Sequence, residues 1–175
     1  MSIQDEINAR CGEEPPRLFL LPPAIPGSPC VRHVFVSPEI NGAAQGPWDD
    51  ADHEFRCGRL RQYLDRLTEG MLVSVGRDPF KKKADAFLVR LDEAEDEVWE
   101  IRVRQPKPGI RIFGRFADKD VFVALSWLGR EVLTNDKEWR DARENCKATW
   151  RKLFPTYPAH TGDDFDKYIS NFILV

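Results

Sequence analysis

Residues 98–115 alternate apolar and charged side chains in two segments that a proline-rich turn joins. The segments read V-W-E-I-R-V-R and I-R-I-F-G-R, and Q-P-K-P-G lies between them. Because successive side chains of a strand point to opposite faces, this alternation predicts a β-hairpin with one apolar face. The other face carries four arginines: Arg102, Arg104, Arg111 and Arg115. Like charges that face each other across a sheet repel, so this cluster needs carboxylate partners or an anionic ligand.

The positive charge of this hairpin is a local feature. Residues 99–119 hold six Lys and Arg against two acids, a net charge of +4, whereas the whole chain has a net charge of −3. A solvated sheet face often carries charged residues that have no further role. The sequence pI of about 5.7 argues against a protein that binds nucleic acid over its whole surface. Any polyanion is therefore expected to bind at a local patch.

Length and composition predict one globular domain with no resident cofactor. The chain has 175 residues, of which 42% are hydrophobic and 31% charged, values typical of an ordinary globular protein. No apolar run approaches the roughly 20 residues that cross a bilayer, and the acidic start M-S-I-Q-D-E lacks the features of a secretory signal. We therefore expect a cytoplasmic protein that does not contact membranes. The four cysteines are scattered, which predicts free thiols and no metal site.

The pattern divides the chain into three parts. Residues 1–30 form an N-terminal extension in which six prolines, all after position 12, predict extended backbone. Residues 31–154 are expected to form one α+β domain. Residues 155–175 follow as a C-terminal extension, after prolines that end the preceding helix.

For the domain we predict an α+β fold in which an antiparallel sheet of about four strands packs its apolar face on two helices. The strands come from residues 87–125, where alternating segments are joined by short turns, together with a strand at 31–36. One-sided apolar stripes predict the two helices at 50–70 and 136–153.

These elements, in this order, resemble the RelE/HigB superfamily of bacterial toxins, in particular its phage-derived branch. The likeness lies in the segments V-W-E-I-R-V, I-R-I-F-G-R-F and V-F-V-A-L-S-W and in a following helix that contains W-R-D-A-R-E-N. The resemblance implies a toxin of a toxin–antitoxin module, and specifically a metal-independent endoribonuclease that cleaves mRNA on the ribosome. Its implied partners are RNA, the ribosome and a cognate antitoxin protein.

The resemblance also implies roles for individual residues. Arg102 and Arg111 would lie in a concave basic face that grips RNA phosphates and would take part in catalysis. The other implied RNA-binding residues are basic side chains of the hairpin and of the segments near it: Lys81, Lys82, Lys83, Arg104, Arg115 and Arg130.

The groups that would transfer protons are less clear from the sequence. Cleavage of RNA without a metal needs a base, an acid, and cations that stabilise the developing charge. Glu100 shares the arginine face and is the candidate base, but it could instead pair with Arg111, which is the favoured interpretation. His33, His53 and His160 are distant from the hairpin in the sequence. The alternative function is a non-catalytic protein-binding module of the same fold, either a ParE-like inhibitor of a protein target or a prophage accessory protein.

Overall fold

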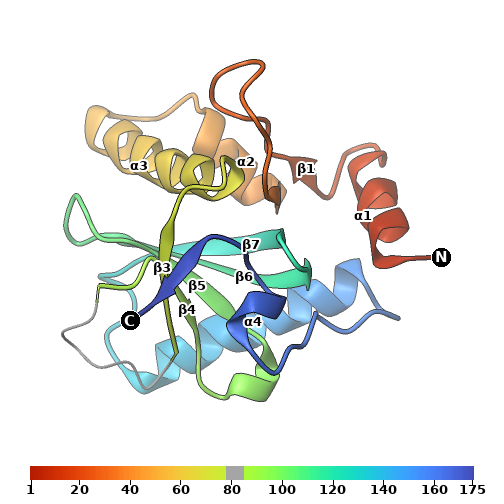
Figure 1. The fold of residues 1–175 in the computed structure, drawn as a ribbon. Coiled ribbons are helices and arrows are strands. Elements are labelled where there is room, and N and C mark those ends of the chain that lie inside the picture. Colours follow the sequence, from red (N-terminus) through yellow and green to blue (C-terminus); the bar gives the residue numbers. More distant parts are fainter. Residues whose placement is uncertain (78–84) are drawn as a thin grey trace.

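A mixed sheet crosses the protein between two layers of helices (Figure 1). The computed structural model describes residues 1–77 and 85–175, and in this part of the chain the sheet has eight strands. They are β1 (Phe19–Leu20), β2 (His33–Val36), β3 (Val73–Arg77), β4 (Leu88–Arg90), β5 (Trp99–Val103), β6 (Ile110–Asp118), β7 (Val121–Gly129) and β8 (Phe172–Leu174). Their order in the sheet is β1-β2-β7-β6-β5-β4-β3-β8.

The centre of the sheet is the meander expected from the alternating segments. Strands β4, β5, β6 and β7 follow one another and pair antiparallel. Parallel strands flank this meander: β2 pairs with β7 on one side, and on the other side β3 pairs with β4 and β8 pairs with β3. The hairpin β5–β6 brings Arg102 directly opposite Arg111.

Four α-helices surround the sheet in the described part of the chain, and each begins with a capping side chain. They are α1 (Ile3–Cys11), α2 (Pro38–Gln45), α3 (Ala51–Thr68) and α4 (Asp136–Leu153). The Asn135 side chain accepts from the Glu138 amide at the start of α4, and the Glu138 carboxylate reaches back in a capping box. Short 3₁₀ turns occur at Ala94–Asp96 and Phe165–Lys167. Within residues 1–77 and 85–175, we find no helix that is long and apolar enough to cross a membrane.

The two faces of the sheet support two separate hydrophobic cores. Helices α2 and α3 cover one face, where Leu60 and Leu64 pack with Trp99 and Ile101 of β5. Helix α4 covers the other face, where Cys146 and Trp150 belong to the same core cluster as Phe113. Helix α1 adds Ile7 to this second core.

The predicted fold was wrong in the number of strands, their direction and the placement of the helices. The sheet is mixed and eight-stranded, with four helices, instead of an antiparallel sheet of about four strands on two helices. The two predicted helices lie on opposite faces, because the face with the arginines also carries apolar residues such as Val89, Phe113 and Val123 that pack with α4. Only part of that face is therefore available for a charged site.

Residues 155–175 contribute to the core and do not form a separate tail. Phe165, Tyr168 and Ile169 are buried, and the Trp99 ring contacts both Phe165 and Tyr168. A buried arginine, Arg32, donates to the carbonyls of Leu67, Met71, Ser170 and Asn171, so it ties the end of α3 to the start of β8.

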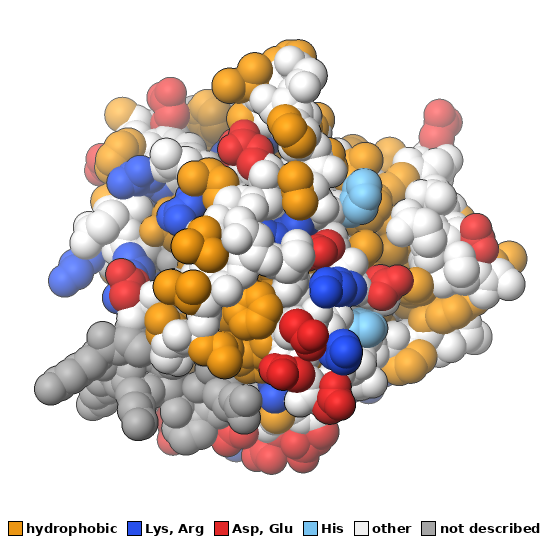
Figure 2. Space-filling model, in the orientation of Figure 1, with side chains coloured by type: hydrophobic (Ala, Val, Ile, Leu, Met, Phe, Trp, Pro, Cys, Tyr) orange, Lys and Arg blue, Asp and Glu red, His pale blue; other side chains and the backbone are white. Residues whose placement is uncertain are grey.

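The surface beside β8 is mixed in character (Figure 2). Hydrophobic side chains gather over this edge strand, where Ile173 and Leu174 are exposed. Positive and negative side chains are interspersed over the coloured part of the same face. This view therefore shows no extended surface of a single charge among the described residues.

Candidate anion-binding site

The arginines of the β5–β6 hairpin gather around one buried carboxylate. Glu100 Oε1 lies 2.5 Å from Arg102 Nε, and Glu100 Oε2 lies 3.5 Å from Arg111 Nε. Glu100 has an exposed fraction of 0%, and each arginine side chain is 14% exposed. One carboxylate thus lies between two guanidinium groups that would otherwise repel each other across the sheet. The ion pair expected between Glu100 and Arg111 is confirmed, and Arg102 shares it.

This arrangement favours a positioning role for Glu100 over a role as a base. A buried charge is stable only when it is paired, and here the carboxylate pairs with two arginines. The carboxylate fixes two guanidinium groups, and a guanidinium group is a planar set of N–H donors that suits an anion. Burial lowers the pKa of Arg111. The charge of Glu100 raises this pKa, and the charges of Arg102, Arg130 and Arg104 lower it further. Two further arginines are therefore close enough to act on the same group.

An open pocket extends the cluster toward the hairpin turn. It has a volume of about 480 Å³, and Arg104, Arg111 and Arg130 line it together with Lys107 of the turn. Arg104 also pairs with Asp85 at 3.1 Å, in a contact where the Arg104 side chain is 42% exposed and the Asp85 side chain 84% exposed. Arg130 lies over the Trp139 ring, 5.6 Å from its centroid, and donates to the Leu133 carbonyl. We call Arg102, Arg104, Arg111 and Arg130 the arginine cluster.

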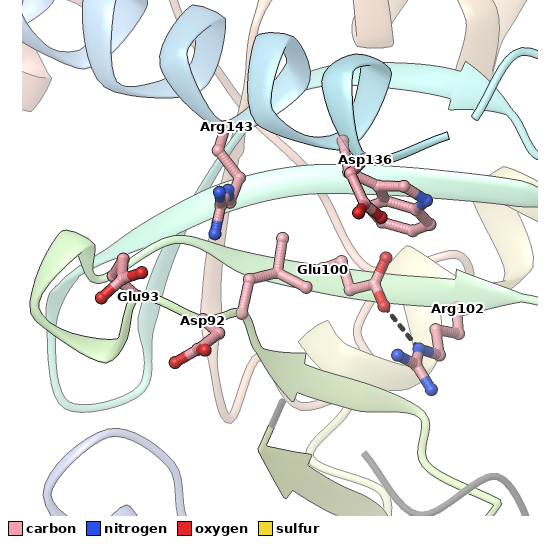
Figure 3. A pocket seen from close by; sticks show the side chains of 8 residues that line it. Asp92, Glu93, Glu100, Arg102, Asp136 and Arg143 are labelled. Carbon is pink, nitrogen blue, oxygen red and sulfur yellow. Dashed lines mark hydrogen bonds and ion pairs between the residues drawn. The ribbon is translucent and has the colours of Figure 1, made fainter. Parts of the chain in front are cut away.

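A second pocket adjoins the cluster on the side of α4 (Figure 3). Its volume is about 410 Å³, and Glu100 and Arg102 form part of its wall. The turn after β4 adds Asp92 and Glu93. The first turns of α4 add Asp136, Trp139 and Arg143, which share one helix face at spacings of three and four residues. Both signs of charge therefore line this pocket.

The remaining predicted site residues lie elsewhere or cannot be placed. Arg115 is far along β6, where it donates to the carbonyls of Asp96 and Glu97 and covers the Trp150 ring at 5.4 Å. Its contacts are those of a structural residue under α4, and it does not join the arginine cluster. Lys81, Lys82 and Lys83 lie outside the described residues.

Sequence reasoning missed Arg143 and Lys107 as pocket residues. Asp136, Trp139 and Arg143 follow helical spacing, but the apolar stripe of this helix favours a core position for Trp139 and gives no signal that Arg143 borders a pocket. These three residues lie on the side of α4 where the face that packs on the sheet meets the face that borders the pocket. Lys107 belongs to the turn, and only the closing of the hairpin places it beside Arg104 and Arg111.

The histidines do not approach either pocket. His33 lies beside Cys30, His53 contacts Cys57 and Trp127, and His160 bonds to the Lys167 carbonyl. Within the described part of the chain, we also find no group of three or more His, Cys, Asp or Glu side chains that could hold a metal ion. The site thus supplies cations in a fixed arrangement, with carboxylates from Asp92, Glu93 and Asp136 at its border.

Comparisons with protein-family models, with curated proteins and with solved structures give no match to this chain. The site is therefore interpreted from its own geometry.

Proposed function

We propose that the protein binds single-stranded RNA, with the arginine cluster on the phosphates. The observation that carries this proposal is the pair Arg102 and Arg111, held by the buried Glu100 at the wall of two open pockets. Guanidinium groups fixed in this way lose little conformational entropy when they bind a phosphate, and their planar donors match its oxygens. Arg104, Arg130 and Lys107 add positive charge on the side of the turn.

We further propose that this binding serves a cytoplasmic toxin of a toxin–antitoxin module, related to RelE and HigB. The resemblance of the sequence supports this, as does the antiparallel meander β4–β7 that is followed by helix α4. Its target would be mRNA on the ribosome, and an antitoxin protein would neutralise it. Cleavage is expected to be weak, because Glu100 is buried against Arg102 and the three histidines contact other parts of the structure.

A salt titration with a labelled RNA oligonucleotide tests the binding. Each phosphate that the protein neutralises contributes about −0.7 to the slope of log K against log salt. The double variant Arg102→Ala with Arg111→Ala is expected to bind at least about tenfold more weakly, with a slope smaller by about 1.4. The control is Arg140→Ala with Arg151→Ala, which removes two exposed arginines of α4.

Either of two results would reject the proposal. One is an affinity and a slope that the double variant leaves unchanged, and the other is an equal loss in the control. If the double variant does not fold, Arg104→Ala with Arg130→Ala replaces it, since both of those residues are exposed.

One observation favours the alternative of a protein-binding module. A pocket of about 340 Å³ has an apolar lining that includes Trp127, Leu133 and Ala142, with Glu39 and Asp141 among its acidic residues. It would suit a basic and apolar segment of a protein better than a nucleic acid. Growth arrest without transcript cleavage would favour this second function.

A further inference from the structure

The pocket beside α4 contains charges that do not neutralise one another. Arg143 is partly buried, and its Nε atom is buried without a hydrogen-bond partner. Four carboxylates line the same pocket: that of Glu100, which pairs with Arg102, and those of Asp92, Glu93 and Asp136. Within residues 1–77 and 85–175, neither Arg143 nor Asp136 takes part in an ion pair. Figure 3 shows Arg143 pointing from α4 into the pocket, with Asp136 farther along the same helix.

A ligand that fills this pocket must offer acceptors to the arginine and donors to a carboxylate. Trp139 lies between Asp136 and Arg143 along the face of α4 that lines the pocket. Leu91 adds apolar surface to the lining. A flat, partly apolar molecule with polar edges fits these walls. Because Arg102 belongs both to this pocket and to the arginine cluster, a phosphate bound at the cluster would place the rest of a nucleotide within reach of the pocket.

Of the RNA bases, guanine has the matching edges. Its O6 and N7 atoms are adjacent acceptors, which an arginine binds in a bidentate manner. Its N1–H and exocyclic amino group are adjacent donors on another edge, and a carboxylate can accept both. Adenine would instead turn its N1 acceptor toward the carboxylate, which is repulsive. Uracil has no exocyclic amino group, and cytosine has a single donor group on its edge.

We infer that this pocket is a guanine-specific subsite of the RNA-binding site. Arg143 donates to O6 and N7, Asp136 accepts from N1–H and the exocyclic amino group, and Trp139 borders the base between them. This inference rests on the proposed RNA binding, since the arginine cluster supplies the affinity for phosphate. It adds a preference for one base, which the cluster alone cannot produce because phosphate contacts carry no sequence information.

Labelled RNA nonamers of uridine with one changed central base test this inference. The central base is guanine, adenine, hypoxanthine (which lacks the exocyclic amino group) or 7-deazaguanine (which lacks N7). We expect the guanine nonamer to bind about tenfold more tightly than the adenine nonamer, as a bidentate base contact allows. Hypoxanthine and 7-deazaguanine should each lose part of this advantage.

Two variants test the two proposed base contacts separately. Arg143→Gln should remove the difference between guanine and 7-deazaguanine, and Asp136→Asn should remove the difference between guanine and hypoxanthine. Matched controls on the same helix are Arg140→Gln and Asp141→Asn, which make the same charge changes at exposed positions. Both controls should keep the full preference for guanine.

The outcomes separate this inference from the proposed function. Equal binding of all nonamers, with binding still lost in the Arg102→Ala and Arg111→Ala double variant, would overturn the guanine subsite and leave RNA binding in place. A guanine preference that survives both Arg143→Gln and Asp136→Asn would also overturn it. No binding of any nonamer would reject the proposed function, and the subsite with it.

Discussion

Arg102 and Arg111 are direct cross-strand partners on β5 and β6, and their guanidinium groups share the carboxylate of Glu100. The carboxylate is fully buried, while both arginines keep part of their surface at the pockets. A sheet can carry two opposed arginines only when their repulsion is compensated. The same carboxylate orients both guanidinium groups, so stability and the proposed anion binding depend on one residue.

The first prediction concerns Glu100. Replacing it by Gln keeps the shape of the side chain but removes the buried negative charge that the two arginines share, so the free energy of unfolding should fall by about 3 kcal/mol. Urea denaturation measures this change, and Glu95→Gln, at an exposed position, should leave stability nearly unchanged. Glu100→Met combined with Arg102→Met and Arg111→Leu should recover most of the loss, because it removes the two positive charges together with the negative one. A single variant as stable as the native protein would contradict this account.

A second prediction concerns growth. Induced expression of a toxin should arrest bacterial growth, and Arg111→Ala should relieve the arrest because it removes a cation of the proposed phosphate site. Arg140→Ala, which removes an exposed arginine of α4, should not relieve it. Growth curves and transcript mapping in the presence of translating ribosomes provide the measurement. Normal growth on induction would reject the toxin proposal, and arrest with intact transcripts would point to a protein target.

The third prediction tests the packing of the last residues. The Tyr168 hydroxyl donates to Glu97 Oε1 at 2.7 Å and accepts from the Gly162 amide at 2.7 Å. Tyr168→Phe would leave the buried Glu97 carboxylate with fewer partners, so we expect a loss of about 1–3 kcal/mol in unfolding free energy. Tyr157→Phe is the matched control, because its hydroxyl contacts the exposed Met1 carbonyl. Equal effects of the two variants would show that the buried network adds no stability.

A fourth prediction concerns alkaline pH and Cys146. Burial raises the pKa of this thiol to about 12, and the nearby Arg115 opposes the rise. In the unfolded chain the thiol ionises near its ordinary pKa of about 8.5, so the unfolded state loses a proton that the folded state keeps. The contribution of the protonated Cys146 thiol to stability is therefore complete below about pH 8.5, and it is lost as the pH rises toward 12. By pH 10 the loss should be about 2 kcal/mol.

Comparison with Cys146→Ala isolates this contribution, because other titrating groups are common to both proteins. The stability advantage of the native protein over the variant should shrink between pH 8 and pH 10 in urea denaturation. An advantage that stays constant over this range would mean that the thiol ionises equally in both states.

The local pattern of the chain determined most of its elements. The alternation in residues 98–125 is strong enough to define three strands and their short turns, since each turn brings neighbouring segments together at little entropic cost. The shared face of Arg102, Arg111 and Glu100 follows from the same two-residue period. The register of the hairpin then sets Arg102 opposite Arg111. The two long helices also follow from their periodicity and caps.

Tertiary structure decided which faces these elements cover and which side chains meet. A period of two predicts that Phe113 and Arg111 share a face of the sheet. It does not predict that α4 covers Phe113 and leaves Arg111 at a pocket. The parallel pairs β2–β7 and β3–β8 join segments that are far apart in the sequence, so no local signal specifies them. The pocket beside α4 arises in the same way, because Asp92, Glu100 and Arg143 come from a turn, a strand and a helix. Their proximity results from burial of the two cores, which local sequence patterns do not encode.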